Sequence, residues 1–191
     1  LQQQADQFLL APGFTQSAVV PHVGFGWLPQ DIAYLRLDQL HQFTARVDQH
    51  PSDMVLGLPA DLQGADALMQ EVKQKFAASK ALVLDLRFNL GGHDAIALQL
   101  VSHLNNAAKT IGYKGLRSGS MQEVKLAANA DPYLKPVIVL TGGMTTSAGE
   151  IMTLALKSLP QVTVIGEATQ GALSDTMQRS MPNGWTLTFG N

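Results

Sequence analysis

The chain has 191 residues, of which 46% are hydrophobic and 15% are charged, and its net charge at pH 7 is −2. This charge excludes the basic surface that nucleic acid requires, and the apolar fraction excludes a disordered tail. No apolar run reaches the ~20 residues that span a bilayer. Because the chain has no cysteine, disulfides, zinc–thiolate sites and thiol nucleophiles are excluded.

Residues 1–30 have weak hydrophobic patterning, and the signal improves from residue 65. We interpret residues 1–60 as an N-terminal lead-in and 61–191 as the core domain. Pro and Gly positions and short apolar runs predict the following elements there: a helix over 2–10, a loop at Gly24, Gly26 and Pro29, a strand over 32–37, a helix over 40–47 and a turn over 59–64.

From residue 65 onward, helical and strand patterns alternate. The predicted elements are a helix over 65–76, a strand over 81–86, a helix over 95–104, an irregular excursion with one or two strands over 109–135, a strand over 136–141, a helix over 148–159, a strand over 162–165, and two short runs over 176–181 and 185–189. This order predicts an α/β fold with a mostly parallel sheet flanked by helices. Asn183-Gly184 predicts a β-hairpin between the last two runs. Since the final run stops with the chain, we expect the core to continue beyond residue 191.

Three loops that are rich in glycine and polar residues follow predicted strands, at residues 87–94, 142–150 and 167–175. In parallel sheets, ligands bind beyond the carboxyl ends of the strands. We therefore expect these three loops to form one cleft.

The middle loop carries a candidate nucleophile, Ser147, which opens a helix directly after a buried strand. The helix N-terminus favours developing negative charge, and nearby backbone N–H groups can bind an oxyanion. Ser147 and Glu150 also have the spacing of a capping box, which is a purely structural role. The two interpretations are compatible.

In the first loop, Gly91-Gly92 allows close approach of the backbone to a ligand and offers a second oxyanion donor. The structural alternative is a simple turn that leads to a helix capped by Asp94. An ion pair between Asp85 and Arg87 is expected at the end of the preceding strand.

None of the five histidines has metal-ligand spacing, so no metal site is predicted. We interpret His93, beside the glycine turn, as a structural or substrate-lining residue. The others are expected on the surface or on helix faces: His22, His41, His50 and His103.

Four segments in this order resemble the tail-specific, or C-terminal processing, serine protease family, which includes the tricorn core and the retinoid-binding repeats of interphotoreceptor protein. The segments are ALVLDLRFNLGG, PVIVLTGGMTTSAGEIMTLAL, VTVIGEATQGALSD and MPNGWTLTFGN. They are similar to the family's D-L-R-x-N-x-G-G loop, S-A-x-E helix start, G-E-x-T-x-G segment and L-P-N-G hairpin. The resemblance covers roughly residues 81–191, with a weaker match at 32–37.

The resemblance implies a crotonase/ClpP-like core and a serine endopeptidase that acts on peptides or proteins without a cofactor. Ser147 matches the nucleophile, and Glu150 matches an acid that supports the site. Gly91 or Gly92, together with the amide of Ala148, would form the oxyanion hole. Family members are commonly exported, which implies a periplasmic or extracellular location.

One position departs from the processing proteases, because Ala172 stands where they place a lysine base. The tricorn-like branch uses a histidine from an upstream segment, and no Asp-Gly-His motif occurs in this chain. We expect the base upstream of Leu1 and a third member at Glu150 or Glu167. His22 is the early candidate within the chain.

Two other functions remain open. The first is that of a catalytically inactive relative that binds peptides or apolar ligands, which Ala172 favours. The second is binding of an acyl thioester between the same glycine loops, as in crotonase-type enzymes. An intact Ser147-x-x-Glu150 helix start favours the peptidase over both.

Overall fold

The computed structural model describes residues 14–20, 22–44, 56–115 and 118–190. Its main sheet has six strands in the order β1-β2-β3-β4-β7-β8. Their bounds are β1 Phe14–Gln16, β2 Gly24–Leu28, β3 Ile32–Arg36, β4 Ala81–Asp85, β7 Val137–Thr141 and β8 Val162–Gly166. Strands β3, β4, β7 and β8 are mutually parallel, whereas β1 and β2 are antiparallel.

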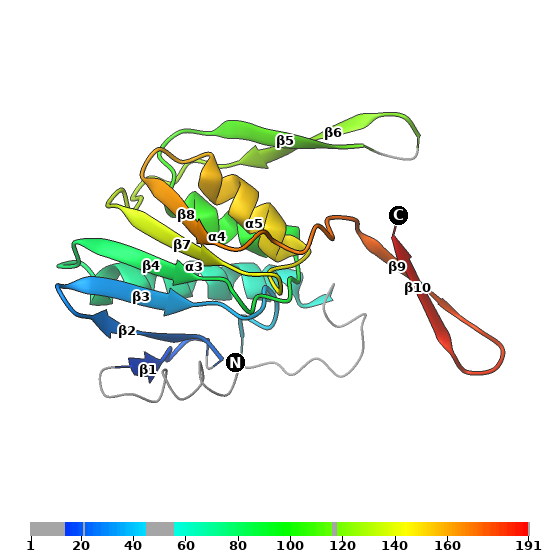
Figure 1. Cartoon of the computed structure of the whole chain (residues 1–191), viewed down its shortest axis with the longest axis horizontal. Helices are drawn as coiled ribbons and strands as arrows, with labels where there is room; N and C mark the ends of the chain where they lie inside the picture. The colour runs from blue at the N-terminus through cyan, green and yellow to red at the C-terminus, as the bar shows by residue number, and fades with distance from the viewer. Residues whose placement is uncertain (1–13, 21, 45–55, 116–117, 191) are drawn as a thin grey trace.

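Helices connect the parallel strands: α3 (Leu58–Lys75) leads to β4, α4 (Asp94–Ser102) follows β4, and α5 (Ala148–Lys157) joins β7 to β8. The strands advance across the sheet in one direction, so right-handed crossovers place all three helices on the same face (Figure 1). An antiparallel hairpin, β5 (Lys109–Gly115) and β6 (Met121–Leu126), is inserted between α4 and β7.

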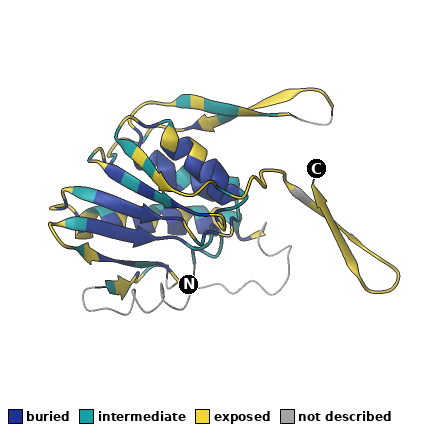
Figure 2. Cartoon of the chain, in the orientation of Figure 1, coloured by how far each residue is buried: buried dark blue, intermediate teal, exposed yellow. Residues whose placement is uncertain are grey.

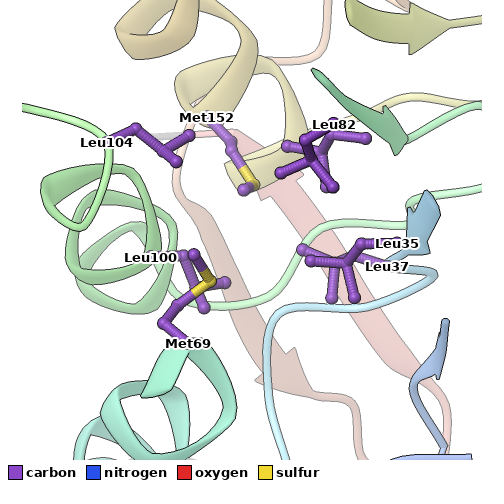
Figure 3. A pocket seen from close by; sticks show the side chains of 8 residues that line it. Leu35, Leu37, Met69, Leu82, Leu100, Leu104 and Met152 are labelled. Atoms are coloured by element: carbon purple, nitrogen blue, oxygen red, sulfur yellow. The ribbon is translucent and has the colours of Figure 1, made fainter. Parts of the chain in front are cut away.

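The hydrophobic core lies between this face of the sheet and the helices (Figure 2). Leu35, Leu82 and Leu84 alternate along β3 and β4 toward the helices and are almost fully buried. A small apolar cavity within this layer is lined mainly by leucines, with Met69 and Met152 (Figure 3). None of the candidate site residues lines it, so the cavity belongs to the core.

The α/β class, with a mostly parallel sheet flanked by helices, is confirmed. The loop predicted at Gly24 and Gly26 is wrong, because both residues lie in β2. The turn predicted over 59–64 is also wrong and is the start of α3. Pro59 occupies its first turn, where a missing N–H costs no helical bond. Gly64 is there because a Cβ atom would lie 1.7 Å from the Phe43 carbonyl oxygen.

The helix predicted over 40–47 does not form at its start, where Leu40 makes a parallel bridge with Gly92. Residues 45–47, like the helix predicted over 2–10, lie outside the described residues. Strands from both sides of residue 60 share the main sheet, and the domain division at that position stays a prediction. No helix among the described residues is both long and apolar enough to cross a membrane.

The C-terminal hairpin, β9 (Thr176–Ser180) and β10 (Thr186–Gly190), forms as predicted and projects from the body (Figures 1 and 2). Strand alternation and register place Met177, Arg179, Leu187 and Phe189 on one of its faces. All four side chains are exposed.

Candidate active site

The three predicted loops meet at the carboxyl edge of β4, β7 and β8, as the sequence predicted. The Thr146 N–H donates to the Asn89 carbonyl at 3.0 Å, which joins the first and middle loops. The Gln170 N–H donates to the Thr145 carbonyl at 2.9 Å, which joins the middle and third loops. Thr145 is fully buried, and its hydroxyl donates to the Leu86 carbonyl at 2.7 Å.

A fourth segment borders this edge, and no sequence pattern predicted it there. Residues 38–40 run beside the glycine turn: the Leu40 N–H donates to the Gly91 carbonyl at 2.8 Å, and Leu90 donates to Asp38 at 2.9 Å. The apolar and polar spacing at 40–47 suggested a helix, so strand-like pairing here was not expected.

Ser147 occupies the N-cap position of α5 with φ +54° and ψ −125°. Non-glycine residues rarely adopt such a backbone, and it costs on the order of 1–3 kcal/mol. The side chain is half-buried, and Ser147 and Glu150 form the predicted capping box at the start of α5. A capping box is compatible with an ordinary extended N-cap backbone, so it does not explain the strained turn.

Glu150 is 5% exposed and accepts three backbone N–H groups from two segments. Its Oε2 accepts from Ser147 at 3.1 Å and from Ala172 at 2.7 Å, and its Oε1 accepts from Gly171 at 2.6 Å. The bond from the Ser147 N–H is the Glu150 side of the predicted capping box, which the structure confirms. The carboxylate also fastens the third loop to the start of α5.

The glycine turn packs directly on the candidate nucleophile. A Cβ atom at Gly91, where φ is +84°, would lie 2.7 Å from the Ser147 Cβ and 2.9 Å from the Thr146 carbonyl oxygen. The Gly91 N–H donates to Asn89 Oδ1 at 2.9 Å. Among the described residues, no acceptor pairs with the N–H groups of Gly92 and Ala148. Two of the three candidate oxyanion donors are therefore available.

Glu167, the other candidate acid, is exposed, and its backbone is held at the end of β7 by Thr141. Within the described part of the chain, no hydrogen bond joins its carboxylate to Ser147 or Glu150. The structure therefore connects Glu150, but not Glu167, to the nucleophile turn.

Among the described residues, no histidine is hydrogen-bonded to Ser147 as a base would be. His93 is the N-cap residue of α4, so the expectation that Asp94 caps this helix is wrong. His22 is exposed and meets Phe43 edge-to-face, and desolvation together with nearby His41 lowers its pKa. His103, expected on the surface or a helix face, is buried and contacts Asp66 at 2.7 Å. No group of potential metal ligands occurs among these described residues.

Lys114 links two walls of the site and was missed because the 109–135 excursion has no clear pattern. Its ammonium contacts the Asp94 carboxylate, which opens α4, and Asp175 Oδ1 at 3.2 Å. Desolvation opposes the charged form, but the bonds to both aspartates outweigh it and raise the pKa of Lys114. Lys114 is therefore a cation at neutral pH and a link between loops, and it is not a base.

Asp85 and Arg87 form the predicted ion pair at the end of β4, with Nη2 and Oδ2 2.7 Å apart. Asp85 also accepts from the Tyr34 hydroxyl at 2.6 Å. This buried carboxylate anchors the first loop to the sheet.

Comparison with known proteins places these features in a family, because residues 31–191 match the model of peptidase family S41. The chain belongs to peptidase family S41. It is 30% identical over 158 residues to a carboxy-terminal-processing protease of Bartonella bacilliformis, covering 81% of this chain and 32% of that protein. It is 37% identical over 93 residues to the carboxy-terminal processing protease CtpA of Bacillus subtilis, covering 49% and 20%.

The fold is similar to that of a candidate peptidase from Parabacteroides merdae, with a TM-score of 0.77 at 22% identity. That match covers all of this chain and 56% of the other. The S41 chain described here spans a third or less of the length of the two curated relatives.

Proposed function

We propose that this S41 chain is the serine-nucleophile core of a peptidase that cleaves peptide bonds through Ser147. The observation that carries the proposal is the strained turn at Ser147, which packs directly against Gly91 of the glycine turn. Backbone strain of this kind is retained where the surrounding structure fixes it, and such positions cluster at active sites.

In the proposed reaction, Ser147 Oγ attacks the carbonyl carbon of the peptide bond while a base takes the hydroxyl proton. The carbonyl electron pair moves to oxygen, and the N–H groups of Gly92 and Ala148 stabilise the resulting oxyanion. When the tetrahedral intermediate collapses, the C–N bond breaks and the amine leaves with the proton. Water then repeats the sequence on the acyl-enzyme, which frees Ser147.

The base is assigned to a histidine N-terminal to residue 1, as the tricorn-like branch of the resemblance implies. Glu150 holds the Ser147 backbone and the third loop, and this supports a positioning role for its carboxylate. The relatives' names suggest carboxy-terminal processing of peptide or protein substrates. We also propose that the core is crotonase-like. We further propose that the protein is exported to the periplasm or the cell exterior, which cell fractionation tests.

Fluorophosphonate labelling of the full-length protein, with mass spectrometry to locate the adduct, tests the nucleophile. We expect the label on Ser147, and we expect Ser147→Ala to lower peptide hydrolysis by at least about 1,000-fold. Ser158→Ala is the matched control, because this half-buried serine at the other end of α5 bonds to Ala155 at 2.7 Å. Peptide hydrolysis that persists in Ser147→Ala would refute the assignment.

A second candidate function is peptide binding without hydrolysis. Ala172 favours it, since this position lacks the lysine of the processing proteases and its N–H is bound to Glu150. A folded protein that binds peptides but takes no label would support this function and exclude the peptidase.

A further inference from the structure

Asn89 is a fully buried polar residue that touches three of the segments around Ser147. Its Nδ2 donates to the Leu37 carbonyl at the end of β3, at 2.8 Å. Its Oδ1 accepts from the Gly91 N–H at 2.9 Å, and its backbone carbonyl accepts from Thr146 at 3.0 Å. The mechanism above does not use this residue.

The Asn89 side chain also packs closely against the first turn of α5. A Cβ atom at Gly149 would lie 2.7 Å from Asn89 Oδ1 and 3.2 Å from its Cγ, so only glycine allows this approach. The start of α5 therefore rests on the Asn89 amide, two residues after Ser147. A displacement of that amide would move both the glycine turn and the nucleophile turn.

The same amide determines which glycine N–H remains available. Because Gly91 donates to Asn89, the N–H of Gly92 is the one that stays without an acceptor in the described structure, together with that of Ala148. A buried amide with both its donor and acceptor satisfied is costly to reorganise, so this arrangement is fixed before substrate arrives.

We propose that Asn89 is a positioning residue that selects Gly92 over Gly91 as the oxyanion donor and holds it in line with Ala148. This inference rests on the proposed peptidase function. It assigns Asn89 no contact with substrate; the residue acts through Gly91 and through the packing of Gly149.

The experiment compares Asn89→Ala with Asn105→Ala in the full-length protein. Asn105 is also buried, and its Nδ2 donates to the carbonyls of Ala107 and Ala127 at 2.7 and 2.8 Å, beyond the C-terminus of α4. Both variants lose a buried amide, but only Asn89 borders Ser147. Thermal unfolding and circular dichroism confirm that each variant is folded.

For Asn89→Ala, we expect kcat to fall by about 10- to 1,000-fold with KM within about threefold, the size of effect seen when an oxyanion donor is lost. Affinity for a peptide boronate, which mimics the tetrahedral intermediate, falls at least about tenfold, whereas affinity for the product peptide stays within about twofold. Asn105→Ala leaves both affinities and kcat within about twofold.

In a second variant, Asn89→Asp, one carboxylate oxygen still accepts from the Gly91 N–H. The other oxygen replaces the Nδ2 donor and so cannot bond to the Leu37 carbonyl. We expect this variant to keep more boronate affinity than Asn89→Ala, and it carries the test if the alanine variant does not fold. A folded Asn89 variant that matches Asn105→Ala in all readouts overturns the inference while Ser147 labelling stands. Absence of label on the wild-type protein overturns the proposed function itself.

Discussion

At residue 91 the backbone has room for a hydrogen atom and for nothing larger. The position combines φ of +84° with backbone and side-chain atoms of residues 146–148 within 3.2 Å of any added Cβ. Two separate penalties thus apply to a side chain there: the left-handed backbone and the collision with Ser147.

Gly91→Ala is expected to reduce peptide hydrolysis by at least about 100-fold, because the added methyl group displaces the nucleophile turn. The matched control is Gly119→Ala, where φ is +85° and no atom lies within 4 Å of the added Cβ. The control carries the backbone cost alone, about 1–2 kcal/mol. Steady-state kinetics and urea unfolding separate the two effects, and equal activity losses in both variants would contradict a steric role.

The sequence predicted Ser147, Glu150 and the glycine turn, because motif spacing and helix-start chemistry are local properties. It did not predict the positive φ of Ser147 or the role of Asn89. Both depend on what a distant segment places nearby: Gly91 against Ser147, and Leu37 and Gly149 around the Asn89 amide. Asn89 falls on the Asn of the D-L-R-x-N-x-G-G pattern, but that pattern does not say which groups its side chain contacts.

At the level of elements, Glu150 couples α5 to the loop after β8. Its two carboxylate oxygens serve three N–H groups in a buried position, and bonds of this kind to a charged acceptor are among the stronger ones.

Glu150→Gln replaces one of these oxygens with an NH₂ group that opposes a backbone N–H. We expect a loss of about 1–3 kcal/mol in the free energy of unfolding and faster hydrogen exchange at Gly171 and Ala172. Glu123→Gln serves as the control, since Glu123 pairs with Lys125 on the β5–β6 hairpin, away from the third loop. Unchanged exchange at 171–172 would show that Glu150 does not hold the third loop.

Element prediction was reliable where hydrophobic period and turn residues agreed, as in β4, β7, β8 and α5. It failed where glycine or proline served packing instead of a turn. Gly24 and Gly26 lie within β2, and Gly64 gives α3 its contact with Phe43. Such close approaches are tertiary properties, and the local sequence carries no mark of them.

For the whole molecule, Asp85 joins β3, β4 and the first loop on the sheet face opposite the helices. Burial alone would raise the pKa of Asp85, but hydrogen bonds from Arg87 and Tyr34 outweigh it and lower the pKa. Burial and the bond to Asp85 raise the pKa of Tyr34, so this hydroxyl remains a donor at neutral pH.

Because the pKa of Asp85 is lower in the folded state, its stabilising effect is complete above the unfolded value of about 4 and is lost as pH falls through the folded value. Urea unfolding from pH 7 to pH 3 should show this loss. Asp85→Asn should cost about 1–3 kcal/mol at pH 7 and weaken the pH dependence below pH 4. Asp131→Asn, which removes the exposed partner of Lys73, should change stability by less than about 1 kcal/mol. If the free energy of unfolding of Asp85→Asn falls below pH 4 as steeply as that of the wild-type protein, this account is contradicted.

The bonds that shape the reactive serine all join residues far apart in the chain: Leu40 with Gly91, Asn89 with Thr146, and Glu150 with Gly171. Contacts of such long sequence separation form late in folding, after the sheet has brought the strand ends together. We therefore expect a nascent or partly unfolded chain to carry Ser147 as an ordinary hydroxyl. The proposed nucleophile site would then form only once these distant segments have come together.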